Sequence, residues 1–326
     1  MKRAQRGRPV REAPQDVDPA VMHVPVMRDA IVDLIATGPG EWIVDGTVGT
    51  GGHTQAILER LPRTRVLGLD VDAAALTAAA QRLEPFGDRV RLQHGSYAEV
   101  DTWVTRCGIG PVGGIVLDLG VSSPQIDLAE RGFSYRHSGA LDMRMDPSVG
   151  PSAAELLQTA AESEIARVLR EYGEEPAARR IARALVERRQ RSPLQTTVDL
   201  VDVVRSSVSG RKPVSALARV FQGVRVWVNG ELENLRLGLG RSLGVLAPGS
   251  ILAVLSYHSL EDRMVKQFFR RQTQGCVCPP DLPRCGCGFV PGFRLSVRRA
   301  LRPPASEVAE NPRARSARLR ALQRLP

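Results

Sequence analysis

The chain contains 326 residues, of which 43% are hydrophobic and 25% are charged. A chain of this size and composition can bury one large core or two ordinary ones, which excludes disordered, collagen-like and small disulfide-stapled proteins. No continuous apolar stretch approaches the roughly 20 residues that span a bilayer. The first 20 residues are basic and lack the apolar centre of a signal peptide. We therefore expect a soluble, cytoplasmic protein with no membrane partner.

The formal net charge of +10 is concentrated in the last part of the sequence. Residues 261–326 contain fourteen Arg or Lys and five Asp or Glu, a net charge of +9, whereas residues 1–260 together carry about +1. Such a segment indicates a polyanionic partner, most simply nucleic acid, because binding releases the counterions of the phosphates. The alternative is a basic face that is merely solvated.

Alternating strands and helices are predicted over the first 119 residues. Short apolar runs predict buried strands, and apolar residues at helical spacing predict helices between them. The strands are expected at 42–44, 66–70, 90–93 and 114–119, and the helices at 30–35, around 56–61 and at 73–83. Continuously apolar strands are typical of a parallel sheet covered by helices on both faces. The predicted fold class is therefore α/β, with a doubly wound sheet.

Helical patterns replace this alternation between about residues 129 and 221, which predicts an inserted all-helical domain. The α/β pattern resumes with a helix at 224–243 and a strand at 251–255, and the chain after about residue 290 is predicted to be largely extended. We expect four parts: a flexible tail at 1–20, an α/β domain formed by 21–128 and 222–290, the helical insert at 129–221, and a basic segment at 291–326.

A glycine-rich turn joins the first predicted strand to the following helix. It reads Asp45-Gly-Thr-Val-Gly49-Thr-Gly51-Gly52-His53, and its glycines let the backbone approach a ligand at the helix N-terminus. A dinucleotide site requires G-x-G-x-x-G, but Thr54 stands three residues beyond Gly51. An acid at the strand end followed by G-x-G is instead typical of enzymes that bind S-adenosylmethionine. We therefore favour this methyl donor over NAD.

Two residues after the next strands are further candidates for the cofactor site. Asp70 ends the second strand, 25 residues beyond Asp45, where an acid accepts hydrogen bonds from ribose hydroxyls. The alternative is that Asp70 caps the following helix, a role that Asp72 can fill equally well. Tyr97 follows the third strand, where its ring either packs on adenine or belongs to the core.

Further motifs lie beyond this turn. Asp118-Leu-Gly-Val-Ser-Ser-Pro-Gln125 follows the fourth strand, and ligands of open α/β sheets bind at the carboxyl ends of strands. The other motifs are His23-Val-Pro-Val, Glu130-Arg-Gly-Phe-Ser134, Leu141-Asp-Met-Arg-Met-Asp146, Tyr172-Gly-Glu-Glu175, Val228-Asn-Gly-Glu231, Ser256-Tyr-His-Ser-Leu-Glu-Asp-Arg263 and Glu310-Asn-Pro-Arg-Ala-Arg-Ser316. With these motifs, from residue 23 to residue 316, the sequence resembles the bacterial 16S ribosomal RNA cytosine-N(4) methyltransferase family.

This resemblance implies a class I methyltransferase domain with an inserted helical domain that recognises the substrate. It also implies S-adenosylmethionine-dependent methylation of the exocyclic N(4) amine of a cytidine, in the decoding (P-site) region of 16S rRNA within the small ribosomal subunit. The cofactor positions fall on Asp45, Gly49, Gly51, Gly52, His53, Asp70, Tyr97, Asp118 and Gln125. Two other classes stay open: an RNA-binding assembly factor with a vestigial cofactor pocket, and a nicotinamide-dependent dehydrogenase, which is much less favoured.

Asp118 is also the candidate catalytic residue. The exocyclic amine of cytosine is a poor nucleophile, because its lone pair is delocalised into the ring, so an enzyme has to position it and accept its hydrogen bonds. Asp118 either orients this amine or holds the amine of the cofactor. Candidate RNA contacts are Arg131, Arg144, His258, Arg298, Arg299, Arg313 and Arg315. Alternatively, Arg131 and Arg144 pair with Asp142 and Asp146, and His258 caps a helix.

Four of the five cysteines are clustered as Cys276-x-Cys278 and Cys285-x-Cys287. Four thiolates this close together fit a tetrahedral zinc ion, and a reducing cytosol disfavours disulfides. We favour zinc, and the alternatives are a disulfide or redox role and inert thiols.

Overall fold

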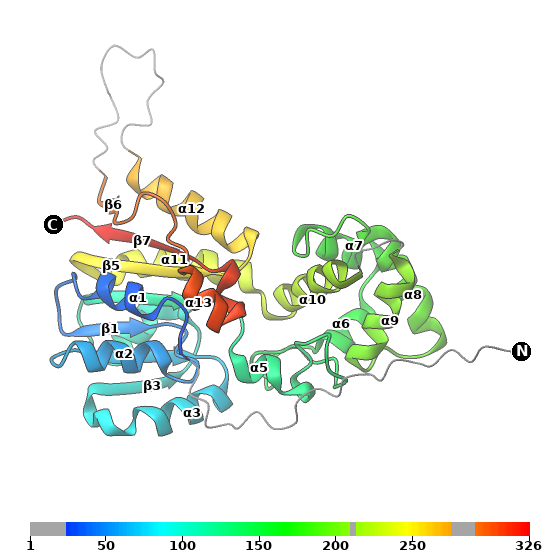
Figure 1. Cartoon of the computed structure of the whole chain (residues 1–326), viewed down its shortest axis with the longest axis horizontal. Coiled ribbons are helices and arrows are strands. Elements are labelled where there is room, and N and C mark those ends of the chain that lie inside the picture. Colours follow the sequence, from blue (N-terminus) through cyan, green and yellow to red (C-terminus); the bar gives the residue numbers. More distant parts are fainter. Residues whose placement is uncertain (1–23, 209–212, 275–290) are drawn as a thin grey trace, which may run out of the picture.

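The computed structural model describes residues 24–208, 213–274 and 291–326. The predicted tail at 1–20 and the four clustered cysteines lie outside these ranges, so the zinc site stays a prediction. Figure 1 shows that the described chain forms a sheet flanked by helices, with a separate group of helices to one side of it. Within the described ranges, no helix is long and apolar enough to cross a membrane.

The sheet has seven strands in the order β3-β2-β1-β4-β5-β7-β6. The first five in the chain are parallel: β1 (Trp42–Asp45), β2 (Arg65–Asp70), β3 (Val90–His94), β4 (Val112–Asp118) and β5 (Leu246–Ser256). β7 (Arg318–Arg324) is antiparallel to β5, and β6 (Phe293–Leu295) is antiparallel to β7. This order, with one antiparallel strand inserted beside β5, is that of the class I methyltransferases, so the predicted fold class is confirmed.

Helices cover both faces of the sheet because successive strand residues point to opposite sides. Ile43 of β1 packs in the core with α1 (Arg28–Ile35), α2 (Gly52–Arg60) and α3 (Ala73–Leu83). Val44, the next residue, packs on the other face with α4 (Val100–Arg106), α11 (Glu231–Val245) and α12 (Ser259–Thr273). The carboxyl ends of all five parallel strands therefore meet at one edge, which both helical layers leave accessible.

A third core belongs to helices alone. It unites α6 (Ala153–Thr159), α7 (Glu162–Glu171), α8 (Ala178–Arg191), α9 (Thr197–Ser207) and α10 (Pro213–Asn229) around Leu157, Leu185 and Phe221. The predicted single helix at 224–243 is wrong. Gly230, at φ +60°, ends α10 and begins α11, because this left-handed conformation breaks a helix and suits glycine. The expected insert boundary at residue 221 falls inside α10.

The segment after residue 290 is not the largely extended tail that its composition predicts. It contains β6, the short helix α13 (Ala305–Glu310) and β7, whose Leu319, Ala321 and Leu322 are fully buried. Six residue pairs align β7 with β5, so this segment completes the sheet.

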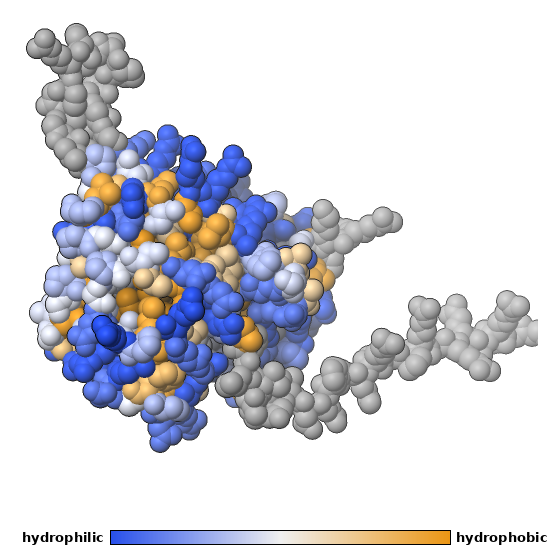
Figure 2. Space-filling model, turned by 60° about the vertical axis from the view of Figure 1, so that its left-hand side comes forward, coloured by the Kyte–Doolittle hydropathy of each residue, from blue (hydrophilic) through white to orange (hydrophobic). Residues whose placement is uncertain are grey.

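Figure 2 shows that polar residues cover most of the face it displays, with small apolar areas between them.

Candidate active site

The glycine-rich turn lies at the carboxyl ends of β1 and β2. Gly49 and Gly51 have φ values of +50° and +85°, and Gly51 is the N-cap of α2. The amide of Gly49 donates to Asp70 Oδ2 at 2.8 Å. Asp45 is almost fully buried under the turn, where its carboxylate accepts from Thr54 Oγ1 at 2.7 Å and from the Thr47 amide at 3.3 Å. Burial raises the pKa of Asp45.

Asp70 was predicted either to accept hydrogen bonds from the ribose or to cap the following helix, and the position of Asp72 bears on this choice. Asp72 is the N-cap of α3, because its Oδ1 accepts from the amides of Ala74 and Ala75. Asp70 instead accepts from the Gly49 amide and, at 2.9 Å, from the Asp72 amide. Burial raises the pKa of Asp70 to about 6. Asp70 is therefore a half-buried carboxyl at the end of β2, directly beside the glycine-rich turn.

Asp118 ends β4 next to this turn and is held from two sides. Tyr257 Oη donates to Asp118 Oδ1 at 2.8 Å, and His53 Nε2 lies 3.3 Å from Oδ2. The amide of Asp118 donates to Thr47 Oγ1 at 2.6 Å, which ties β4 to the turn. The carboxylate side chain keeps 23% of its area exposed, whereas His53 keeps 5%. Asp118 thus presents a fixed acceptor at the strand edge.

His53 is a buried imidazole without a well-formed hydrogen bond among the described residues. Its Nε2 lies close to Asp118, but neither ring nitrogen has a partner in hydrogen-bonding geometry. Burial disfavours the charged ring, yet the carboxylates of Asp118, Asp45 and Glu307 together raise the pKa of His53. Because a buried polar atom normally has a partner, the ring nitrogens indicate a polar ligand at this position.

Gln125 and Arg131 meet on Asp72. Gln125 Nε2 donates to Asp72 Oδ2 at 2.8 Å, and Arg131 Nη1 lies 2.9 Å from the same oxygen. Arg131 Nη2 donates to the carbonyls of Arg144 and Met145. The Arg131 guanidinium, with its side chain 14% exposed, is thus paired inside the protein, and its contact with RNA stays a prediction.

Arg144 is also engaged internally. Its Nε and Nη2 each donate to Asp142 at 2.8 Å, and Nη1 donates to the Gly150 carbonyl. The pairing alternative therefore describes Arg144 in this structure, and its contact with RNA stays a prediction. Sequence reasoning gave no role to Asn229, which fixes the same loop. Its amide group donates to the Met143 carbonyl and accepts from the Met145 amide, and holds Met143 at φ +62°.

Tyr97 packs inside the α/β domain. Its ring lies so close to Gly238 of α11 that an added Cβ there would approach Tyr97 Cδ2 to 2.5 Å. Burial raises the pKa of Tyr97. The core alternative therefore describes much of this side chain, and contact of the ring with adenine stays a prediction.

His258 caps α12 and does not reach outward. It accepts from the Glu261 amide, its Nε2 lies 3.1 Å from Glu261 Oε1, and its side chain is 9% exposed. This geometry corrects its prediction as an RNA contact. Glu231, His258 and Glu261 come close enough to hold a cation among the described residues. Arg225 already donates to both carboxylate oxygens of Glu231, at 2.8 and 2.9 Å, and supplies the positive charge there.

Part of the basic segment is also paired within the protein. Arg318 and Arg320 donate to the two oxygens of Asp262 at 2.8 and 2.7 Å, and Arg313 donates to Asp127 at 2.6 Å. Three predicted RNA contacts, Arg298, Arg299 and Arg315, are exposed. Val297, Arg298, Arg299 and Leu301 line an open hollow of about 670 Å³.

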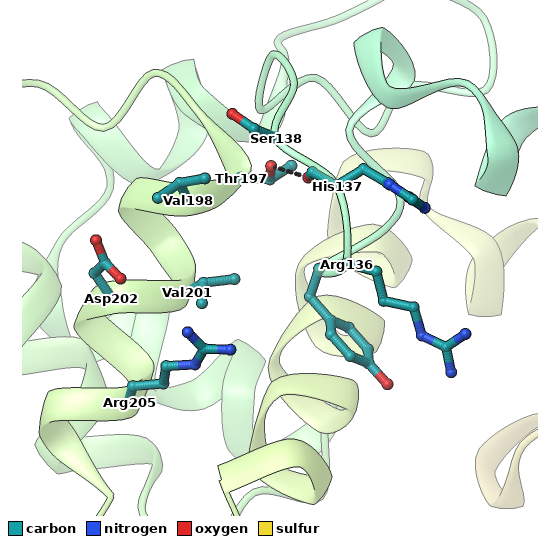
Figure 3. Close-up of a pocket in the computed structure, with 9 residues that line it drawn as sticks. Arg136, His137, Ser138, Thr197, Val198, Val201, Asp202 and Arg205 are labelled. Carbon is teal, nitrogen blue, oxygen red and sulfur yellow. Dashed lines mark hydrogen bonds between the residues drawn. The ribbon is translucent and has the colours of Figure 1, made fainter. Parts of the chain in front are cut away.

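A smaller hollow of about 180 Å³ lies among the helices of residues 153–229, between α9 and the segment 135–138. Figure 3 shows Val201 and Arg205 of α9 facing this segment, with the Thr197 hydroxyl bonded to the His137 carbonyl. Arg136 and Arg205 are exposed and have no ion-pair partner among the described residues. The hollow therefore has a cationic rim.

A model of the MraW methylase family matches residues 20–325. The chain belongs to this family. It is 50% identical over 307 residues to "Ribosomal RNA small subunit methyltransferase H" of Syntrophotalea carbinolica, covering 93% of this chain and 98% of that protein. Proteins of the same name from Heliobacterium modesticaldum and Symbiobacterium thermophilum are each 46% identical, over 93% and 94% of this chain and 98% of each protein. A solved rRNA methylase from Streptococcus thermophilus aligns with a TM-score of 0.41 at 12% identity, covering 92% of this chain and 94% of that one.

Membership of the MraW methylase family confirms the predicted resemblance and decides between the two cofactors for S-adenosylmethionine. The residues at the strand edge fit this molecule. Gly49 and Gly51 keep the turn open in conformations that side chains disfavour, and Asp70 offers a carboxylate beside it. The ring nitrogens of His53 are buried without a hydrogen-bond partner in the described part of the chain. The alternative of a nicotinamide-dependent dehydrogenase, which was much less favoured, is thereby excluded.

Proposed function

We propose that this methylase acts in the cytoplasm on the exocyclic N(4) amine of a cytidine in the decoding region of 16S rRNA, within the small ribosomal subunit. One observation carries the choice of an amine. The Asp118 carboxylate is fixed beside the glycine-rich turn by the Tyr257 hydroxyl, with His53 close to its other oxygen and part of its area exposed. A fixed carboxylate is the acceptor that an exocyclic amine requires.

When bound, S-adenosylmethionine supplies an electrophilic methyl group on a sulfonium. Asp118 accepts a hydrogen bond from the cytosine amine, which orients the nitrogen and directs its lone pair at the methyl carbon. Bound S-adenosylmethionine would supply the methyl group for the new N–C bond together with its leaving sulfur, which would keep the electron pair of the broken S–C bond. The amine is left with one proton too many, and the Asp118 carboxylate accepts that proton and passes it to water.

The placement of Cys107 favours an amine over a ring carbon as the target. Methylation of a cytosine ring carbon uses a cysteine nucleophile. Cys107 directly follows α4 and precedes β4, so it lies at the amino edge of the sheet, whereas Asp118 lies at the opposite, carboxyl edge. No other cysteine lies within the ranges that the structure describes. A carboxylate therefore does the chemistry at the reactive edge.

The RNA is held mainly by exposed cationic side chains. Arg298, Arg299 and Arg315 contact phosphates beside the open hollow, and Arg136 and Arg205 do so on the helical insert at 129–221. Phosphate contacts position an RNA without reading its sequence. An RNA-binding assembly factor would need these arginines, but it would not need the hydrogen-bonded side chains of Asp70 and Asp118 beside Gly49 at the carboxyl ends of the strands. It is therefore the less favoured function.

Replacing Asp70 with Asn is expected to weaken S-adenosylmethionine binding about 10- to 100-fold, roughly 1.5–3 kcal/mol, because the ribose loses a charged acceptor. The pKa of Asp70 is raised to about 6 by burial, so protonation removes the same acceptor in the wild type. Affinity should therefore fall as the pH decreases through about 6, and D70N should lack this dependence. Calorimetry between pH 5 and pH 8 measures both effects. The exposed Asp88 gives the control, D88N, and wild-type affinity in D70N would assign Asp70 a purely structural role.

Mass spectrometry of ribosomal RNA from cells that lack this protein tests the proposed function. We expect the loss of one cytosine N(4) methylation in 16S rRNA and its return when the gene is restored. Purified protein should then methylate either free 16S rRNA or small subunits isolated from the deficient cells, which identifies the substrate form. An unchanged modification pattern in the deficient cells would overturn the proposal.

A further inference from the structure

Tyr257 is the first residue after β5 and is fixed at both ends. Its amide donates to Glu261 Oε2 at 3.0 Å, so the capped N-terminus of α12 holds its backbone. The ring packs near Gly120, where an added Cβ would lie 3.6 Å from Tyr257 Cδ2. Because Asp118 pairs in register with Leu255, the tyrosine follows at the reactive edge of the sheet. Its hydroxyl is therefore aimed at Asp118 by two independent contacts.

Titratable side chains from several neighbouring elements surround Asp118. Tyr257 bonds one oxygen, and His53 of α2 faces the other. Asp45 of β1 lies near enough to interact with Asp118 and His53. The charges of Glu261 of α12 and Glu307 of α13 also act on Tyr257 and help to raise its pKa. Several of these neighbours are carboxylates. The Tyr257 hydroxyl is a neutral group that donates a hydrogen bond to the Asp118 carboxylate and so holds it in place.

We propose that Tyr257 is a positioning residue for methyl transfer, whose hydroxyl orients the Asp118 carboxylate toward the cytosine amine. This inference rests on the proposed function. A hydrogen bond donated to a carboxylate stabilises its charged form and limits its rotation. Burial and the neighbouring carboxylates raise the pKa of Tyr257, so it stays a donor throughout the working pH range.

Tyr257→Phe removes one oxygen and keeps the ring. We expect kcat on small-subunit rRNA to fall roughly 10- to 100-fold, the value of one hydrogen bond to a charged group. Affinity for S-adenosylhomocysteine should stay within about twofold of the wild type, because Tyr257 acts on the transferred group and not on binding. The matched control is Tyr172→Phe on the insert, which loses a hydroxyl but keeps its ring beside the Arg167 guanidinium. Its kcat should equal that of the wild type.

A double-mutant cycle separates positioning from a structural role. If Tyr257 acts through Asp118, Y257F should have little further effect on kcat once D118N is present. Additive losses of kcat in the cycle would overturn the inference.

The outcomes also separate this inference from the proposed function. If the wild-type protein leaves small-subunit rRNA unmethylated, the proposed function fails and the role of Tyr257 fails with it. If the wild type methylates a cytosine amine while Y257F keeps the wild-type kcat, only the role of Tyr257 is refuted. A large loss of kcat in Y257F with an intact thermal transition, together with non-additive losses in the double-mutant cycle, supports both.

Discussion

Replacing Asp118 with Asn is expected to reduce kcat for rRNA methylation by at least about 100-fold, within the range for losing a general base. The asparagine has the same shape and keeps an oxygen that can accept from Tyr257. It loses the negative charge that accepts the amine proton. The expected defect is therefore in the chemical step and not in the shape of the site.

The fold of this variant should survive. Asp118 is not part of the apolar core, its side chain is 23% exposed, and its charge lies near the buried carboxyl of Asp45. Removing that charge relieves a repulsion, so the melting temperature should change little. Circular dichroism and the rate per folded molecule measure the two effects separately. The control is D101N, because Asp101 of α4 has a side chain that is 45% exposed. This variant should keep both the melting temperature and the rate per folded molecule of the wild type. If D118N unfolds while each folded molecule keeps its activity, Asp118 is not catalytic.

The strands and the glycine-rich turn were predictable because their signals are local. A buried parallel strand is a continuous apolar run, and the turn between Asp45 and His53 is contiguous in the chain. Tyr257 was missed because it lies 139 residues from Asp118. The signal was present: both residues follow predicted buried strands, and neighbouring strands of a parallel sheet end at one edge. Only the pairing of β4 with β5 shows that the two ends are adjacent.

Net charge indicated the kind of partner but not which arginines are available to it. The sequence reveals how many arginines a segment has, but not which carboxylates or carbonyls fold against them. Arg131 forms an ion pair with Asp72, and Arg144 forms one with Asp142; both also donate to backbone carbonyls. Arg318 donates to Asp262. Such an ion pair leaves the net charge of the segment after residue 260 unchanged, so the net charge does not reveal how many of its arginines are already paired. The cations available to RNA are therefore fewer than the composition suggests.

Ending the chain after residue 317 is expected to abolish cooperative folding, and not only to weaken RNA binding. The deletion removes β7, which pairs with β5 along six residues and separates it from β6. It also removes Leu319 and Leu322, which are fully buried in the cores on opposite faces of the sheet. Removing one buried leucine side chain costs roughly 2–5 kcal/mol, while a whole domain has only about 5–15 kcal/mol of stability.

The damage extends beyond the buried side chains. Without β7, the inner strand β5 becomes an edge with unpaired backbone groups, which favours aggregation. Asp262 loses both arginine partners, whose charges lower its pKa in the intact protein despite partial burial. The shortened chain should therefore show no sharp thermal transition and no binding of S-adenosylhomocysteine. A truncated chain that melts cooperatively and binds this ligand with wild-type affinity would contradict the structural role of β7.

The matched variant that tests RNA binding alone is R298A/R299A. Both arginines are exposed and lie outside β7, so their removal should leave the melting temperature and cofactor affinity unchanged. Removing one arginine–phosphate interaction should reduce the slope of log affinity against log salt concentration by about 0.7–0.9, so the slope should fall by roughly 1.4–1.8 in the double variant. Filter binding of 16S rRNA at several salt concentrations measures it. An unchanged slope would mean that RNA binds to other parts of the surface, whereas a lower melting temperature would make these arginines part of the fold, as Arg318 and Arg320 already are.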